Sequence, residues 1–275
     1  MSNPTPTIRV NVNVTNPGQF FACCGLLELA DRLWPGAEGW FEEREFCVAC
    51  GGTLRQLLSI LMMDEPEQIE RLECNGLEVK KLIAPLRFSF DGGSTTALTL
   101  DAWTTIRLDK GKAEVSANSP WNFWSGQQTS HGIWCGLRAV LAAQLANFQE
   151  EDYASIFSKR VFQKGRFGFD PGPAWNALDV GFSPNEHSME VESSASAELL
   201  AAVGLQRFRP LVSLDRESFQ YATWNEPLAP SIAAAAMCGG MSYHRSVWYC
   251  GTVVSRGQYA ALGYSYPISK GVSDE

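Results

Sequence analysis

The 275-residue sequence predicts an α+β fold in which small, largely antiparallel sheets pack with helices. Two observations support this class. The chain opens as a strand, a tight turn and a helix, and it closes with two strand-like segments, Val247–Val254 and Ala260–Tyr266, that suggest a hairpin. The segments between these ends do not alternate in the regular way that a doubly wound parallel sheet requires. We therefore expect antiparallel pairing.

The first elements follow from the spacing of apolar residues. Apolar and polar residues alternate over Ile8–Thr15, which predicts a half-buried strand. Asn16-Pro17-Gly18 predicts a turn. Helical spacing then continues from Phe20 to Leu33 and stops at Trp34-Pro35-Gly36, which predicts a first helix over this stretch.

The middle of the chain mixes both kinds of element. Residues 39–50 predict one further strand, and Thr53 is a suitable cap for a helix over Leu54–Met62. Short strands are predicted between Leu82 and Leu108, and an apolar helix at about residues 131–148 follows them. No period of 20–50 residues repeats, so a solenoid or propeller is not expected.

The second half is less regular. Asp170-Pro171-Gly172-Pro173 and Ser183-Pro184-Asn185 predict loops. Ala195–Val203 predicts a short helix that ends at Gly204, since glycine commonly terminates helices. We treat residues 1–275 as a single subunit, with one candidate internal boundary near 150–170.

The net charge of −8 belongs to one part of the chain. Residues 28–78 hold 12 acidic and four basic residues, and the remainder holds 18 of each. The acidic average therefore does not exclude a nucleic-acid partner, because a subunit of a larger assembly can bind phosphates with local basic patches.

The absence of a targeting pattern in this sequence predicts a cytoplasmic protein. The start of the sequence shows no secretory signal pattern. The longest aliphatic runs, such as Ile232–Cys238, are far shorter than the ~20 residues of a membrane helix. We therefore expect no membrane association.

The eight cysteines predict reduced thiols, because disulfides are rare in the cytosol. Cys47 and Cys50 have the spacing of half a zinc site, and Cys23 and Cys24 could supply a second pair. Adjacent cysteines are poor zinc ligands, however, and no further pair follows. We therefore expect buried, unliganded thiols, no metal and no cofactor. The three histidines occur in no known catalytic spacing, so no catalytic residue is predicted.

Two stretches combine basic and aromatic residues without any acid. Tyr153–Phe169 has four bases among five aromatic rings, and Pro227–Gly271 has three bases with five tyrosines and one tryptophan. Cations that neutralise phosphates, beside rings that stack on bases, are typical of single-strand recognition. The alternative to nucleic-acid binding is that the bases lie in a solvated loop and the aromatic rings are part of the core.

Two further segments add candidate contacts. Arg207 and Arg209 follow the last residues of a predicted helix, and they would point the same way if the chain there is extended. The loop Asn118–Ser130 places amides and tryptophans ahead of a helix, where they could bind a nucleic-acid backbone or anchor the loop on the core. The predicted phosphate contacts are Lys159, Arg160, Lys164, Arg166, Arg207 and Arg209, and the predicted polar readers are Gln127 and Gln128.

Four segments carry a resemblance to known proteins. They are Thr15–Asp31 (TNPGQFFACCGLLELAD), Phe123–Gln128 (FWSGQQ), Ala177–Asn185 (ALDVGFSPN) and Glu198–Pro210 (ELLAAVGLQRFRP). In this order they resemble a protein family encoded in type I-U (now I-G) CRISPR loci, the Csb/Csx group. None of the four is a catalytic signature.

The resemblance implies a non-catalytic subunit of a type I CRISPR RNA-guided surveillance (Cascade) complex. Its partners would be guide RNA, target DNA, the other Cascade subunits and a recruited helicase-nuclease that cuts the DNA. In such complexes base pairing reads the sequence, while proteins hold the backbone and inspect a short flanking motif.

The place of this chain within such a complex stays open. A compact large subunit is the first expectation. A RAMP-like backbone subunit is the second, and a ferredoxin-like N-terminal part would suit the strand–turn–helix opening. Outside this class, the alternatives are a zinc- or thiol-dependent enzyme built on Cys23, Cys24, Cys47 and Cys50, and a scaffold that contacts only protein.

Overall fold

The computed structural model describes residues 4–69, 85–90, 97–109, 112–124, 128–163, 165–171, 191–241, 246–256 and 259–269. Within these ranges the protein has six helices and several small sheets, and every strand pair is antiparallel. The predicted α+β class with largely antiparallel pairing is confirmed.

The N-terminal sheet contains β1 (Ile8–Asn11), β2 (Glu38–Glu42) and β3 (Glu45–Ala49), in the order β1-β3-β2. The single strand predicted over residues 39–50 is wrong, because the chain reverses there and forms a hairpin. Glu43 makes the reversal possible by taking a left-handed backbone conformation, with φ of 53°. Nothing in the local sequence announces this turn, since glycine or asparagine is the usual residue for it.

A turn was predicted at Asn16, Pro17 and Gly18, but these residues form the start of α1 (Pro17–Leu33) instead. Asn16 is the N-cap, and its side-chain oxygen accepts a hydrogen bond from the backbone N–H of Gln19. Pro17 occupies the first helical position, where its missing N–H costs nothing. The predicted helix from Phe20 to Leu33 is confirmed and starts three residues earlier.

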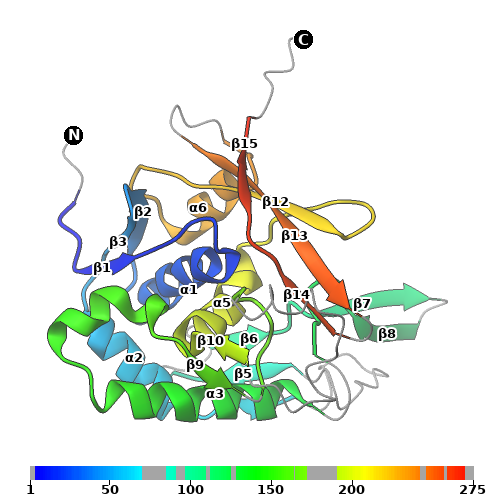
Figure 1. Cartoon of the computed structure of the whole chain (residues 1–275), viewed down its shortest axis with the longest axis horizontal. Coiled ribbons are helices and arrows are strands. Elements are labelled where there is room, and N and C mark those ends of the chain that lie inside the picture. The colour runs from blue at the N-terminus through cyan, green and yellow to red at the C-terminus, as the bar shows by residue number, and fades with distance from the viewer. Residues whose placement is uncertain are drawn as a thin grey trace.

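Two buried helices, α1 and α5 (Ala195–Arg207), pack together at the centre of the molecule (Figure 1). They touch at Gly25 and Gly204. A Cβ atom on Gly204 would overlap the carbonyl oxygen of Phe21, and one on Gly25 would overlap that of Leu200. The predicted end of the helix at Gly204 is therefore wrong. This glycine permits a close helix crossing and does not stop the helix.

Helices α2 (Leu54–Met63) and α3 (Ser130–Leu145) lie together below this pair in Figure 1. Both were predicted, although α3 ends before residue 148. A capping box begins α2: Thr53 accepts a hydrogen bond from the backbone of Gln56, and the Gln56 side chain accepts one from the backbone of Thr53.

The C-terminal sheet lies on the other side of the helix pair. Its strands are β11 (Leu211–Val212), β12 (Ser218–Ala222), β13 (Trp248–Arg256), β14 (Tyr259–Leu262) and β15 (Tyr266–Ile268). The order is β11-β12-β13-β14, and β15 also pairs with β13. The predicted closing hairpin is confirmed as β13 and β14.

The remaining elements are short. They are β4 (Glu67–Gln68), β5 (Leu86–Phe88), β6 (Leu98–Leu100), β7 (Thr104–Asp109), β8 (Lys112–Ala117), the 3-10 helix η2 (Glu150–Ser158), β9 (Val161–Gln163), β10 (Val191–Ser193) and α6 (Pro230–Met237). The short strands predicted before residue 108 are confirmed by β5, β6 and β7.

The start of the fold matches a ferredoxin-like unit only in part. The order β1, α1, β2, β3, α2 and the central place of β3 are those of the first five elements of such a unit. A fourth strand would then pair with β1. Within the described residues β1 pairs with β3 alone, and η2 packs against β1. A ferredoxin-like or RAMP-like N-terminal part is therefore not confirmed.

One apolar cluster extends from Ile8 to Leu262. It joins the two ends of the chain: the ring centroids of Phe20 in α1 and Tyr221 in β12 are 4.2 Å apart. The internal boundary near residues 150–170 stays a prediction. In the described part of the chain, no helix combines the length and the apolar character needed to cross a membrane.

Candidate functional site at the starts of two helices

The basic stretch Tyr153–Phe169 was predicted to bind phosphates, and its first base is partly exposed. The Lys159 ammonium lies 2.6 Å from a carboxylate oxygen of Asp152 and 5.7 Å from the ring centroid of Phe148. Its side chain is 39% exposed. Lys159 is thus paired within the chain, yet a phosphate could still reach it.

The neighbouring base is directed inward. Arg160 Nη2 donates to Asp170 Oδ1 at 2.9 Å and to the Pro171 carbonyl oxygen at 3.3 Å. The Asp170 side chain is fully buried, and that of Arg160 is 16% exposed. Because removing one member of a buried ion pair leaves an uncompensated charge, this arginine is held by the fold.

Arg166 is partly buried beside the same aspartate. Its Nη1 donates to the backbone oxygen of Asp170 at 3.4 Å, and its charge faces Glu198 as well. Burial lowers the pKa of Arg166 from its ordinary value. Like Arg160, it serves the interior in this structure, and a phosphate contact for either residue stays a prediction without geometric support.

The aromatic rings of this stretch divide in the same way. Phe157, Phe167 and Phe169 are fully buried. Phe167 stacks between Trp103 and Phe169, at centroid distances of 5.6 Å to each. Phe162 in β9 is 59% exposed. For most of the stretch, the alternative of core aromatics describes the structure.

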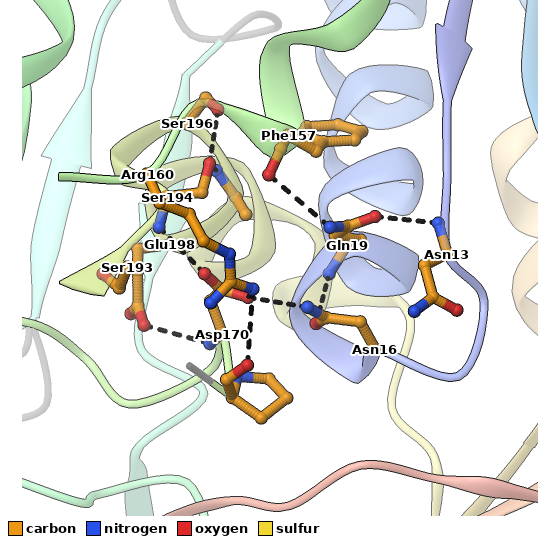
Figure 2. Close-up of polar contacts among 12 residues, drawn as sticks. Asn13, Asn16, Gln19, Phe157, Arg160, Asp170, Ser193, Ser194, Ser196 and Glu198 are labelled. Carbon is orange, nitrogen blue, oxygen red and sulfur yellow. Dashed lines mark hydrogen bonds and ion pairs between the residues drawn. The ribbon is translucent and has the colours of Figure 1, made fainter. Parts of the chain in front are cut away.

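Asp170 is the centre of a buried polar cluster that joins the starts of α1 and α5 (Figure 2). One carboxylate oxygen accepts from the Asn16 side chain at 2.7 Å, and the other accepts from the backbone N–H of Ser194 at 2.8 Å. Asn16 caps α1 and Ser194 caps α5. One carboxylate therefore binds both capping residues, at the ends of two helices where negative charge is favoured.

Glu198 holds the chain on either side of Phe169. Its two carboxylate oxygens accept from the backbone N–H groups of Gly168 and Asp170, both at 3.0 Å. Gly18 closes the cluster from α1, where a Cβ atom would lie 2.6 Å from the Asp170 Cα. The segment that contains Asp170 is thus clamped between both helices.

Burial controls the electrostatics of this cluster. It raises the pKa of Glu198 from 4.5 to about 7, while Arg166 and the two backbone donors oppose that rise. Burial also raises the pKa of Asp170, and Arg160 and Asn16 oppose it. A carboxyl group with a pKa near 7 suits proton transfer, but Glu198 is fully buried and no substrate can contact it in this conformation.

The remaining predicted contacts lie apart from the cluster. Arg207, the last residue of α5, pairs with the buried Glu28 of α1. Arg209 is 62% exposed, with Asp101 at 3.9 Å. The exposed Gln128 has its side-chain amide beside Gly165, so the structure brings the loop and the basic stretch together here. Lys164 and Gln127 lie outside the described residues.

The loop Asn118–Ser130 is anchored on the core at its described positions. Trp121 and Trp124 are 6% and 8% exposed, and the ring centroid of Phe123 lies 6.0 Å from that of Phe169. The anchoring alternative therefore accounts for its tryptophans. Thr129 caps α3 through a hydrogen bond with the backbone of Gly132.

Cys23, Cys24 and Cys47 are buried thiols, and Cys50 is partly exposed. Burial raises the pKa of Cys23 and Cys24 well above the ordinary value and that of Cys47 to about 11. Among the residues that the structure describes, no group of three or more His, Cys, Asp or Glu side chains could hold a metal ion.

The sequence alone does not identify Asn16, Asp170, Ser194 and Glu198 as one unit. Asn16 and Asp170 each precede a Pro-Gly pair, which is a general turn signal. Ser194 precedes a helical pattern and is a recognisable N-cap. No local signal connects residues that are 154 positions apart.

A scan against models of protein families found no match, and neither the curated proteins nor the solved structures gave a match.

Proposed function

We propose that the protein is a non-catalytic subunit of a type I CRISPR RNA-guided surveillance complex, where it binds guide RNA or target DNA within the assembly. One observation supports this most. Two of the four segments that resemble the Csb/Csx group form one buried unit, and the first residue of a third contacts Phe169 beside it. Thr15–Asp31 and Glu198–Pro210 cover α1 and α5 almost entirely, and Phe123 contacts the segment between them. Ala177–Asn185 lies outside the described residues.

Several polar residues of these segments are engaged in contacts within the chain. Asn16 and Glu198 bind the segment around Asp170, Gln19 accepts a hydrogen bond from the backbone of Asn13, and Glu28 pairs with Arg32 and Arg207. Polar residues that hydrogen-bond or form ion pairs within the chain stabilise a scaffold. Binding would then occur on the outer surface that this scaffold supports, which agrees with a binding subunit better than with an enzyme.

The buried cysteines weigh against the thiol-dependent alternative. A catalytic cysteine needs a thiolate in an accessible, electropositive site. Cys23 and Cys24 are fully buried, and their raised pKa values keep them protonated near neutral pH. Of the two subunit roles, we propose that of the large subunit. A RAMP-like subunit is less well supported, because the fourth strand of a ferredoxin-like unit is not found among the described residues.

The acidic block supplies a surface for a neighbouring subunit. The turn between β2 and β3 carries the exposed Glu42, Glu43 and Arg44, and Glu45 follows it. Arg9 pairs with Glu42 and Glu45 on the surface, where such pairs contribute little to stability. Acidic residues in this position suit a basic partner surface.

The experiment is a pull-down of the tagged full-length chain from cells that express its native operon. We expect guide RNA and other Cascade subunits to copurify. Absence of both overturns the proposal, and stoichiometric zinc in the purified chain would favour the enzyme alternative instead.

A matched pair of variants tests the acidic turn. Glu42→Lys/Glu43→Lys should reduce the yield of copurified subunits, because it reverses charge on the proposed contact. Glu150→Lys/Glu151→Lys reverses the same charge on the exposed start of η2 and should leave the yield unchanged. Equal yields from both variants would remove this surface from the proposed interface.

A further inference from the structure

Two tyrosines at the C-terminal end of the fold lie on the surface. Tyr264 is 44% exposed and Tyr266 is 54% exposed, while Ser265 between them is 6% exposed. This alternation is that of an extended strand, in which side chains two positions apart point to the same side. Both rings therefore project from the outer face of the segment that leads into β15.

Their spacing fits successive bases. Residues two positions apart along a strand are separated by about 7 Å, so each ring is free to accept a different base of an unstacked single strand. The backbone under them is held in place: Gly263 N–H donates to the Thr252 carbonyl at 2.8 Å, and Ser265 N–H donates to the Thr15 carbonyl at 2.7 Å. Tyr264 thus lies in a hydrogen-bonded connection between β14 and β15, and Tyr266 is the first residue of β15.

The contact with Thr15 joins two stretches of sequence that contain no acid. The sequence has no Asp or Glu before Glu28, and none between Glu226 and Asp274. Figure 1 shows the two stretches meeting, with the red segment around β15 passing the start of α1. Tyr221 reinforces the junction by donating from its hydroxyl to the Val14 carbonyl at 2.7 Å.

The two stretches that meet at this junction carry bases and no acid in their sequence, and such a composition favours a polyanion. A phosphate backbone that crosses Tyr264 and Tyr266 meets no carboxylate from either stretch, and the second stretch also carries three bases in its sequence. The same sheet does carry Asp215 and Glu217, in the hairpin between β11 and β12. That hairpin lies beside Val253, on the side of β13 opposite to β15.

We propose that Tyr264 and Tyr266 form a stacking platform for two neighbouring bases of a single-stranded nucleic acid. The inference deepens the proposed function and rests on it, because it names the surface on which a subunit of this kind holds the guide RNA or the displaced DNA strand. Stacking on a ring does not depend on base identity, so the platform binds without sequence preference.

Phe162 provides a matched control. Its ring is 59% exposed, which is comparable with the two tyrosines, and it also lies on a strand. Its direct cross-strand partner is Glu192, however, so a carboxylate stands next to the ring. That carboxylate disfavours a phosphate backbone, so Phe162→Ala should weaken binding of nucleic acid far less than the loss of the two tyrosines.

The test measures fluorescence anisotropy of labelled 20-mers of oligo(dT) and oligo(U) with the purified full-length chain at low salt. Tyr264→Ala/Tyr266→Ala should weaken binding by roughly fivefold or more for each ring removed. Tyr264→Phe/Tyr266→Phe keeps both rings and should bind as the wild type does. Circular dichroism of each variant checks that the fold is intact.

The results distinguish failure of the tyrosine platform from failure of the proposed function. Wild-type affinity in the double alanine variant overturns the platform, and so does a folded wild-type chain that binds neither oligonucleotide. If guide RNA still copurifies in the pull-down, the proposed function stands without the platform. If binding depends on the tyrosines but no RNA or subunit copurifies, the platform stands and the Cascade assignment fails. The ratio of the two affinities tells whether RNA or DNA is the preferred strand.

Discussion

The stretch Tyr153–Phe169 and the stretch Pro227–Gly271 have the same composition signal, but some of their basic and aromatic side chains lie in different environments. Both combine bases and aromatic rings without an acid. In the first, Arg160 and Phe167 are directed into the interior. In the second, Tyr264 and Tyr266 are on the surface. The same pattern therefore occurs with side chains in the core in one stretch and with exposed tyrosines in the other.

The difference arises at the edge of each stretch. Asp170 follows Phe169 directly and provides the buried counter-charge that draws Arg160 and Arg166 inward. The second stretch is preceded by Glu226, which is exposed and so supplies no buried counter-charge, and the next acid after it in the sequence is Asp274. A buried cation needs a partner, so the nearest acid decides whether a basic stretch is able to enter the core.

Substitutions of two adjacent basic residues, Lys159 and Arg160, should differ most in their effect on stability. Arg160→Met leaves the carboxylate of Asp170 buried without its ion pair, and we expect a loss of about 3 kcal/mol in the free energy of unfolding. Lys159→Met removes a solvent-exposed pair and should shift the melting temperature by only ~1–2 °C. Urea denaturation of both variants measures this. Equal effects would mean that the two bases occupy equivalent environments, against the structure.

The buried cluster should also make stability depend on pH. Because the folded pKa of Glu198 is about 7 and its ordinary value is 4.5, the folded chain keeps a proton that the unfolded chain releases. This stabilisation is complete below pH 4.5 and is lost as the pH rises through 7, with a total of about 3 kcal/mol at most. The raised pKa of Asp170 acts in the same direction. The lowered pKa values of Asp152 and Asp215 act only below this window.

Glu198→Gln isolates the contribution of this group. The amide cannot ionise, so the free energy of unfolding should vary less between pH 5 and pH 8 in the variant than in the wild type. Urea titrations at each pH provide the comparison. An unchanged slope would show that Glu198 does not titrate in this range.

The structure also shows which features local sequence is able to specify. The start of α2 was predictable because Thr53 and Gln56 satisfy each other within one turn. The role of Gly204 was not, because glycine after a helical pattern signals a stop unless its partner is known, and that partner, Gly25, is distant in sequence. The Asp170 cluster was hidden for the same reason. Its members come from three separate segments, and an alternation or spacing rule covers only one.

Two glycines in helices test how tightly the cluster is packed. Gly18→Ala places a methyl group against the backbone of Asp170 and should cost about 1–3 kcal/mol through overpacking. Gly136 of α3 has no neighbouring atom within 4 Å of an added Cβ. Gly136→Ala should therefore stabilise the chain, by about 1 kcal/mol, through helix propensity alone. A stabilising effect at Gly18 would mean that the segment around Asp170 moves away easily.

The exposed tyrosines should show the smallest effect on folding. Tyr264→Ala and Tyr266→Ala remove rings that already face solvent, so each should shift the melting temperature by no more than about 1–2 °C. Differential scanning calorimetry measures the shift without added nucleic acid. A large shift would place these rings in the core, as in the first stretch, and the contrast between the two stretches would disappear. A small shift together with weakened oligonucleotide binding would assign the rings to recognition, because a side chain that the fold does not need is free to serve a partner.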